Sequence, residues 1–298
     1  MDRKWSGKTQ GGTFGQKSVL FYFKYGSLRL AYLFLYFIIP FYLIFDRKGY
    51  HAIHWYSKHC INKKRSFHLP FIFKNFYNFG QVFIDRFALF GNPKNRFEFI
   101  YENKELFDQY LKGEKGFIVT SAHVGNFELL SYSIDKIEKT LHPILFGGEA
   151  EVFQKLRSGV FSDKNIEPII LNEEGNYIFE INNALQKGGI VSMPADRTIG
   201  KSKVFTTQFL GHSATFPLGV FHIASSLDVP ILTIFVVKEK YKVYKVYISE
   251  LQVDREAQNK HKTAELLGNA YVQNLEKILQ KYPNQWYNFY QFWDSKVS

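Results

Sequence analysis

A histidine and a glutamate five positions apart, His123 and Glu128, lie in the stretch SAHVGNFELLS and form an HX4E pattern. An imidazole can accept a proton from a hydroxyl near neutral pH, and a carboxylate on its other ring nitrogen fixes the tautomer and stabilises the imidazolium. Such a pair would let an acceptor hydroxyl attack an activated acyl group directly, without a serine nucleophile. A histidine satisfied inside a turn, with a glutamate on a solvated helix face, would account for the same residues without any function.

The elements around this pair predict that it lies at the edge of a sheet. The apolar run GFIVT, residues 116–120, predicts a buried strand that ends just before His123, and Gly125 and Asn126 predict a turn into a helix that begins near Phe127. Open α/β sheets bind ligands at the carboxyl ends of their strands. We therefore expect a substrate beside His123, and the backbone N–H groups after Gly125 are candidates for stabilising a tetrahedral oxyanion.

The rest of the chain alternates between strand and helix patterns, without an internal repeat or a linker that would divide it. Residues 61–298 therefore predict one α/β domain with a mixed, largely parallel sheet flanked by helices. Helices are predicted over residues 69–89, 102–111 and 263–281, and over NYIFEINNALQKG, which Gly188 would stop. Further strands are predicted over residues 142–146, 167–171, 189–193, 230–237 and 244–250.

Composition limits the class of partner. The 298 residues are 46% hydrophobic, which is enough for a sizeable core, and the formal net charge of +11 favours an anionic partner. Basic residues are dispersed and no nucleic-acid-binding module is recognisable, so an anionic membrane surface or an acidic carrier protein is the preferred partner rather than nucleic acid. The single cysteine, Cys60, excludes an intrachain disulfide and fits a reducing cytosolic setting.

The N-terminal segment, residues 1–60, is basic and aromatic, and we expect it to associate with a membrane. Residues 30–45, LAYLFLYFIIPFYLIF, run 16 positions without a charge, at or just under the length that spans a bilayer, and Pro40 would kink or end a helix. Because basic residues flank both ends, the positive-inside rule gives no orientation. We expect a kinked, re-entrant or interfacial helix with both flanks on the cytoplasmic face, and a buried core helix is the alternative.

Several further segments resemble one family, in the order in which that family carries them. Together with SAHVGNFE they are similar to the signatures of the lipid A biosynthesis (LpxL/HtrB-like) acyltransferases, a branch of the membrane-bound lysophospholipid acyltransferase superfamily. The resemblance covers nearly the whole chain. The segments are WSGKTQGGTFG at 5–15, NFYNFGQVFIDR at 75–86, Asp196 and Arg197 in PADRTIG, FLGHSATFPLG at 209–219, and PNQWYNFYQFW at 283–293.

The resemblance implies an acyltransferase at the cytoplasmic face of the inner membrane. It makes His123 the general base and Glu128 the carboxylate that orients it, with a lipid hydroxyl as acceptor and acyl carrier protein or acyl-CoA as thioester donor. It implies no cofactor and no metal. The residues that it implies for substrate binding are Gly125, Asn126, Asp196, Arg197, Phe209, Leu210, Gly211 and Pro217.

Two departures from the family pattern leave the acceptor open. Ala195 stands where related sequences usually carry glycine before the Asp-Arg pair, and Gly125 with Asn126 stands where many lipid A enzymes carry Asn-Trp. Acylation of another lipid therefore remains an alternative, for example of a glycerophospholipid, an amino-acid-containing lipid or a polyene pigment ester. A non-catalytic membrane-binding protein on the same scaffold is the alternative outside enzymes.

Two other patterns suggest sites that we consider weaker. ADRTIGKS, residues 195–202, lacks the first glycine of a phosphate-binding loop, and the residues after it are strand-like where that loop opens a helix. His51, His54, His59 and Cys60 have metal-capable side chains, but their spacing fits no usual zinc pattern. A basic, aromatic helix explains this second group.

Overall fold

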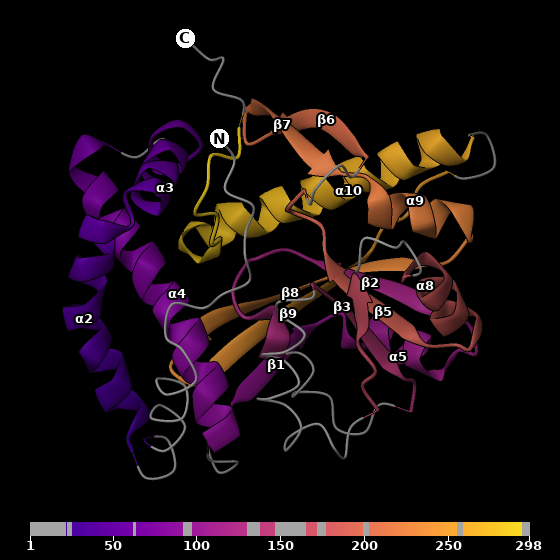
Figure 1. The fold of residues 1–298 in the computed structure, drawn as a ribbon, viewed down its shortest axis with the longest axis horizontal. Coiled ribbons are helices and arrows are strands. Elements are labelled where there is room, and N and C mark those ends of the chain that lie inside the picture. Colours follow the sequence, from indigo (N-terminus) through magenta and orange to yellow (C-terminus); the bar gives the residue numbers. More distant parts are fainter. Residues whose placement is uncertain are drawn as a thin grey trace.

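The computed structural model describes residues 22, 26–61, 64–91, 97–129, 138–146, 165–171, 177–198, 203–254 and 259–293. Within these ranges, strands form a seven-stranded sheet in the order β1-β9-β8-β2-β5-β3-β4 (Figure 1). In this sheet only β8 and β9 run antiparallel; the other neighbours are parallel. The strands are β1 (Glu98–Glu102), β2 (Phe117–Ser121), β3 (Leu141–Phe146), β4 (Ile169–Leu171), β5 (Ile190–Pro194), β8 (Ile231–Lys240) and β9 (Val243–Glu250).

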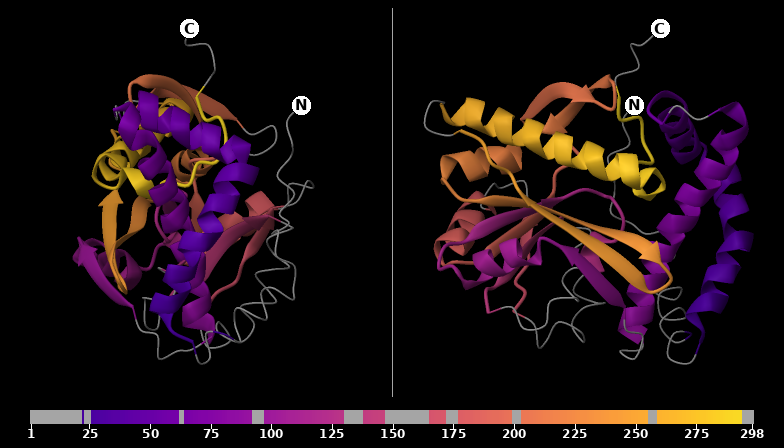
Figure 2. Two further views of the ribbon diagram at one scale, coloured as in Figure 1. Left: turned by 90° about the vertical axis from the view of Figure 1, so that its left-hand side faces the viewer. Right: turned by 180° about the vertical axis from the view of Figure 1, so that it is seen from behind.

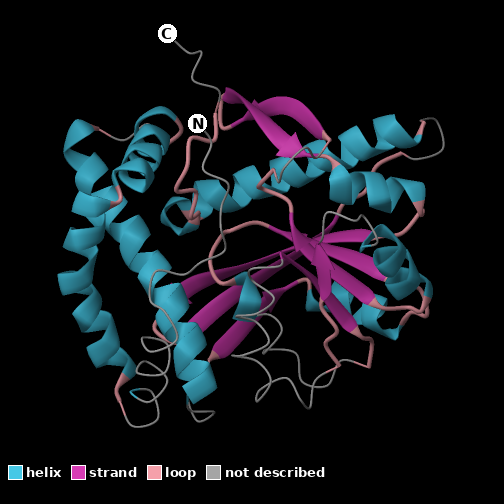
Figure 3. Cartoon of the chain, in the orientation of Figure 1, coloured by secondary structure: helices cyan, strands magenta, loops and turns pink. Residues whose placement is uncertain are grey.

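Helices flank this sheet, and further helices lie beyond one of its edges (Figure 3). This arrangement confirms the predicted fold class. The predicted strands, and the helices predicted over residues 69–89, 102–111, 176–188 and 263–281, are present within a few residues of their expected ends. Where a helix is expected to begin near Phe127, the structure has a 3-10 turn, and residues 130–137 after it lie outside the described residues. Gly188, at φ +80°, follows α8 as the predicted stop. The helices are α2 (Leu28–Phe45), α3 (Arg47–His59), α4 (His68–Gly91), α5 (Lys104–Lys112), α8 (Tyr177–Gln186), α9 (Gly219–Ser226) and α10 (Lys260–Lys281), with 3-10 turns η1 (Arg65–Phe67), η2 (Phe127–Leu129) and η3 (Pro283–Gln285).

A separate hairpin of β6 (Val204–Phe209) and β7 (His212–Pro217) stands on the far side of α10 from the sheet (Figures 1 and 2). Its turn uses two residues with positive φ, Leu210 at 52° and Gly211 at 84°. The strand-like run after the ADRTIGKS pattern is therefore β6, and a phosphate-binding loop would need a helix there. Residues 199–202 of that pattern lie outside the described residues.

Successive side chains of a central strand point to opposite faces of the sheet, so the core has one part on each face. In β2, Phe117 and Val119 pack with Phe107 of α5 on one face, while Ile118 belongs to the cluster on the other face. That second cluster includes Leu267 of α10 and the other apolar residues on the same side of this helix. Because both faces are covered, β2 is buried along its whole length. The residues that follow β2 are therefore anchored at its end.

The N-terminal helices share this core. Leu28, Tyr32, Leu35 and Ile39 form the buried stripe of α2 at helical spacing, and Leu35 and Ile39 belong to the same cluster as the α10 residues. Pro40 lies inside α2, which continues uninterrupted to Phe45. The packed core is thus continuous across residue 60, where the sequence suggests a boundary.

The outer face of α2 is apolar and exposed. This helix is the one described element long and apolar enough to cross a membrane, and only 22% of its 18-residue window is buried. Figure 2 shows α2 along one side of the molecule, against α4 and away from most of the sheet. A core helix would be covered on most of its surface, so this exposure favours the expected membrane contact. The exposed side chains include Leu30, Leu33, Phe34, Phe37, Phe41 and Ile44.

Candidate active site

The turn after β2 is fixed by close backbone contacts. Ala122 and Val124 are fully buried on either side of His123, and Gly125 has φ +59°. A Cβ on Gly125 would lie 2.0 Å from the carbonyl oxygen of Val236 on the neighbouring strand β8. Only glycine fits this position, because both the backbone angle and the space exclude a side chain. The turn therefore presses directly against the sheet and positions His123 at the carboxyl end of β2, as predicted.

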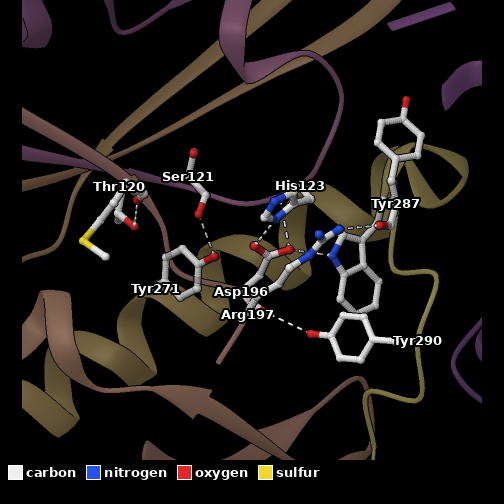
Figure 4. A network of polar contacts seen from close by, with 10 residues as sticks. Thr120, Ser121, His123, Asp196, Arg197, Tyr271, Tyr287 and Tyr290 are labelled. Atoms are coloured by element: carbon white, nitrogen blue, oxygen red, sulfur yellow. Dashed lines mark hydrogen bonds and ion pairs between the residues drawn. The ribbon is translucent and has the colours of Figure 1, made fainter. Parts of the chain in front are cut away.

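His123 forms a tight pair with the buried carboxylate of Asp196. Its ring atom Nδ1 lies 2.7 Å from Asp196 Oδ1, and its backbone N–H donates to Asp196 Oδ2 at 3.0 Å (Figure 4). Asp196 follows β5, which is the parallel neighbour of β2, so the ends of these two strands bring the residues together. The histidine side chain is 25% exposed and the aspartate 2%, so the imidazole is the accessible member of the pair.

Aromatic residues from the C-terminal part of the chain hydrogen-bond to Asp196 and to the backbone around His123. Trp286 Nε1 donates to Asp196 Oδ2 at 3.1 Å, and Tyr287 N–H donates to the carbonyl of His123 at 2.9 Å. Tyr271 of α10 donates its hydroxyl to the carbonyl of Ser121 at 2.9 Å. The residues around His123 are therefore held by the sheet on one side and by residues 271–287 on the other (Figure 4).

The surroundings keep Asp196 ionised. Burial by itself would raise its pKa, but attraction to His123, the hydrogen bonds from His123 and the charge of Arg197 together hold the pKa of this carboxyl well below its usual range. A carboxylate that is ionised near neutral pH and contacts Nδ1 selects the tautomer with the proton on Nδ1, and it can stabilise the imidazolium that forms when the ring takes up a proton during the reaction. The unprotonated Nε2 of that tautomer is the atom suited to accept a proton.

Arg197 supports the site through the backbone. Its Nη2 donates to the carbonyl of Tyr287 at 2.9 Å, and its guanidinium lies 5.9 Å from the ring centre of Tyr290. The Tyr290 hydroxyl in turn donates to the carbonyl of Asp196 at 3.3 Å. The Asp196–Arg197 pair thus contacts His123 on one side and the C-terminal residues on the other.

Glu128 forms an ion pair with an arginine of α4. Both of its carboxylate oxygens accept hydrogen bonds from Arg86 Nη1, each at 2.9 Å. A carboxylate that contacts Nδ1 of His123 is that of Asp196, a contact that the HX4E pattern does not indicate. The adjacency of β2 and β5 could have indicated Asp196, since carboxyl ends of parallel strands meet at one edge. The role of Glu128 in catalysis stays a prediction.

The backbone N–H groups at the turn are partly occupied. Gly125 N–H donates to the carbonyl of Gln285 at 2.8 Å, and Asn126 N–H donates to the carbonyl of Val236 at 2.7 Å. The side chain of Asn126 is buried and its Nδ2 donates to the carbonyl of Val82 at 3.3 Å. Neither N–H of Gly125 or Asn126 is therefore available to an oxyanion, and both residues serve to fix the turn. The 3-10 turn η2, Phe127–Leu129, comes directly after them in the chain.

The other predicted substrate-binding residues lie in the β6–β7 hairpin. Phe209 is fully buried, with its ring centre 5.5 Å from that of Trp286, and its carbonyl accepts from Trp293 Nε1 at 3.2 Å. Leu210 and Gly211 form the hairpin turn, where Leu210 N–H donates to Glu276 of α10. Pro217 ends β7. Phe209 thus reaches Asp196 only through Trp286, and direct substrate contact by these residues stays a prediction.

The histidines of α3 have aromatic neighbours. The rings of Trp55 and His59 stack with centres 4.6 Å apart, and the rings of His54 and His68 lie 5.2 Å apart. In the part of the chain that the structure describes, no group of three or more histidine, cysteine or acidic side chains is arranged to hold a metal ion. The aromatic contacts are therefore the ones that account for the α3 histidines.

Comparison with known proteins decides the family. The family model for the bacterial lipid A biosynthesis acyltransferases matches residues 58–295. The chain belongs to this family. Membership makes the chain an acyltransferase of lipid biosynthesis rather than a non-catalytic membrane-binding protein. The match begins before α4 and ends after Trp293, so it covers His123, Glu128, Asp196 and the residues that close the site.

Among the solved structures that are similar to this chain is that of another acyltransferase. The 1-acyl-sn-glycerophosphate (LPA) acyltransferase PlsC from Thermotoga maritima is 13% identical, and the similarity covers 84% of this chain and 95% of that chain with a TM-score of 0.39. No curated protein matches the chain. The family assignment therefore rests on the match over residues 58–295.

Proposed function

We propose that this acyltransferase moves a fatty acyl chain from a thioester, most simply that of acyl carrier protein, to a hydroxyl of a lipid A-type acceptor at the cytoplasmic face of the inner membrane. The observation that carries the mechanism is the hydrogen bond between His123 Nδ1 and the buried, ionised Asp196. It leaves Nε2 as the general base. Asp196 orients the ring and stabilises the imidazolium, the role that the sequence pattern assigns to Glu128.

The proposed reaction needs no covalent enzyme intermediate. Nε2 of His123 takes the proton of the acceptor hydroxyl while its oxygen attacks the thioester carbonyl, and a tetrahedral oxyanion forms. Collapse of this intermediate forms the ester bond, breaks the carbon–sulfur bond and releases a thiolate. The imidazolium then returns the proton to the thiolate, so that the enzyme ends in its starting state.

Glu128 enters the proposal as a second carboxylate of the site, held by Arg86. Both of its oxygens accept from one guanidinium nitrogen, and the two side chains, Arg86 and Glu128, are only 18% and 23% exposed. A partly buried ion pair holds its members in a defined orientation better than an exposed one does. We propose that this ion pair fixes Glu128, five residues after His123, as a second carboxylate of the site, in support of Asp196.

The exposed apolar face of α2 supports attachment to the membrane, and the net charge of +11 supports an acidic donor protein. A cytoplasmic donor requires the site on the cytoplasmic face. The exposed residues of α2 and the basic surface therefore fit the same arrangement, in which the enzyme lies at the bilayer and collects its donor from the cytosol.

The test is acyl transfer by the purified, detergent-solubilised enzyme from acyl carrier protein thioesters to lipid A precursors, followed by mass spectrometry. His123→Ala should lower kcat by at least about a hundredfold, because a general base contributes about 10²–10⁴ in rate. His261→Ala is the matched control, since His261 is 63% exposed on α10, and it should leave kcat unchanged.

Two results would contradict the proposal. Full activity of a folded His123→Ala variant would remove the general base. Transfer of the acyl group to a glycerophospholipid or an amino-acid lipid, but not to the lipid A precursor, would keep the mechanism and replace the acceptor. Glu128→Gln belongs in the same series, because unchanged activity would remove that residue from the site without affecting Asp196.

A further inference from the structure

A pocket of about 380 Å³ lies between α2, α4, the end of the β8–β9 hairpin and η3. It does not include His123 or Asp196 among its lining residues. Three lysines line it, Lys74 from α4 and Lys238 and Lys240 from the end of β8, together with the tyrosines Tyr32, Tyr241 and Tyr282. Figure 2 shows the end of the β8–β9 hairpin reaching the α4 helix beside α2, where these elements meet.

One of the three lysines is neutralised inside the protein. Lys238 Nζ contacts the buried carboxylate of Asp85 and the hydroxyl of Tyr32, and Tyr244 donates to the same carboxylate. Burial lowers the pKa of Lys238, while Asp85 opposes this effect. This cluster ties α2 and α4 to the sheet, so it provides a rigid floor for the pocket.

The other two lysines keep their charge available. Lys74 and Lys240 are exposed, and within the described ranges of the chain no ion pair occupies either of them. Glu239 is the acidic residue of the pocket, and it accepts a hydrogen bond from the Tyr282 hydroxyl at 2.7 Å. Arg29 of α2 extends the positive edge, since its guanidinium lies 5.0 Å from the ring centre of Tyr241.

The pocket wall includes the apolar helix α2. Tyr32 lies on the buried side of α2, and the opposite side of the same helix exposes Phe34, Phe37 and Phe41. A ligand in the pocket would therefore lie within one helix diameter, about 10 Å, of side chains suited to hydrocarbon. Tyrosines and lysines around such a pocket are the residues that favour a lipid headgroup region.

We propose that this pocket binds the phosphate of an anionic membrane lipid, at a site separate from the acyl-transfer reaction. Lys74 and Lys240 supply the charge, and the Tyr241 hydroxyl and the amide side chains of Asn78 and Gln285 supply hydrogen bonds to the phosphate oxygens. The lipid is favoured over a soluble phosphate because α2 holds the pocket at the bilayer surface.

One residue of the pocket, Gln285, is also hydrogen-bonded to the turn that carries His123. Gln285 lines the pocket and exchanges two hydrogen bonds with the backbone of Lys238, each at 2.8 Å. The carbonyl of the same Gln285 accepts from Gly125 N–H at 2.8 Å. A headgroup in the pocket would therefore contact the residue whose carbonyl holds the turn of His123.

The test compares binding of three proteins to vesicles: the wild type, Lys74→Ala/Lys240→Ala, and the control Lys112→Ala/Lys187→Ala. The control lysines are exposed and lie on and after helices at the end of the molecule opposite α2 (Figure 1). Vesicles contain phosphatidylcholine alone, with phosphatidic acid, or with oleate at the same surface charge. Because a lysine near an anionic surface strengthens binding by about fivefold, we expect the pocket variant to bind phosphatidic acid vesicles about 25-fold more weakly.

The quantity that tests the proposal is the preference of each protein for phosphatidic acid vesicles over oleate vesicles. The wild type should prefer phosphatidic acid over oleate vesicles, the pocket variant should lose this preference, and the control variant should keep it. A pocket variant that keeps the preference, or a wild type that binds oleate vesicles equally well, would overturn the phosphate site. If inorganic phosphate raises the Tm of the wild type but not of the pocket variant, while vesicle preference is equal in both, the ligand is a soluble phosphate and the lipid proposal fails.

This measurement is independent of acyl transfer. A His123→Ala enzyme without activity should still show the phosphatidic acid preference, because His123 does not line the pocket. Equal unfolding temperatures of the three proteins exclude misfolding as the cause of weaker binding. Failure of the headgroup site and failure of the catalytic proposal therefore give different results.

Discussion

At the scale of single residues, the important feature is the carboxylate that faces Nδ1 of His123. An ionised oxygen 2.7 Å away accepts the Nδ1 proton, whereas the amide of an asparagine can turn its NH₂ toward the ring. An asparagine NH₂ that donates to Nδ1 favours the tautomer with the proton on Nε2. In that tautomer Nε2 cannot act as a base. The negative charge of Asp196, rather than its size, therefore sets the reactive tautomer.

We expect Asp196→Asn to lower kcat by about 10²–10⁴ with little change in KM, because it removes general-base catalysis and leaves substrate contacts in place. The measurement is steady-state kinetics with a folded variant across pH. Asp228→Asn is the matched control, since Asp228 lies in the turn before β8. A rise in KM at unchanged kcat would assign Asp196 to substrate binding, as the family resemblance implies.

At the scale of elements, the sequence predicts the sheet but not how its parts meet. Long apolar runs such as β2 and β8 are buried on both faces, and their patterns identify them directly. The strand β1 has alternating exposure at the sheet edge, and no prediction covered it. The pairing of Asp196 with His123 depends on β2 and β5 being neighbours, which is a long-range relation that no local spacing of residues encodes.

The turn after β2 gives an element-scale prediction. Gly125→Ala should destabilise the protein by about 2–5 kcal/mol, because alanine is strained at positive φ and its Cβ would overlap the Val236 carbonyl. Gly219→Ala is the control: nothing lies within 4 Å of a Cβ there, and its expected cost is near zero. Urea unfolding of both variants checks this, and equal stability of the two would show that the turn tolerates a side chain.

The exposed apolar face of α2 gives a second element-scale prediction. Phe34→Ser, Phe37→Ser and Phe41→Ser together should move the protein from the membrane toward the soluble fraction, because they remove exposed apolar surface without touching the packed stripe of α2. Deletion of residues 1–48 is a less clean test, since it also removes Leu35 and Ile39 from the core. Unchanged membrane binding by the folded triple variant would place attachment elsewhere.

At the scale of the whole molecule, the buried ion pair links stability to pH. The pKa of Asp196 in the folded state lies below its ordinary value, because His123 and Arg197 favour the ionised form. A lowered carboxyl pKa contributes stability that is fully present above the unfolded pKa and is lost as pH falls toward the folded pKa. The folded protein should therefore lose this contribution progressively below about pH 4.

Comparison with Asp196→Asn isolates this contribution from that of the other carboxylates. The difference in unfolding free energy between wild type and variant should shrink as the pH falls below about 4. Equilibrium unfolding at several pH values measures it. A difference that grows on acidification would show that the folded pKa of Asp196 is raised instead.

The hydrogen bond from Trp286 to Asp196 has a consequence for the order of synthesis. The α2 helix leaves the ribosome long before Trp286, Tyr287 and the other residues that close the site behind His123. We expect the nascent chain to meet the bilayer through α2 while Asp196 still lacks one of its donors. Anchoring would then precede activity, so an enzyme that consumes acyl thioesters would become competent only where its lipid acceptor already is.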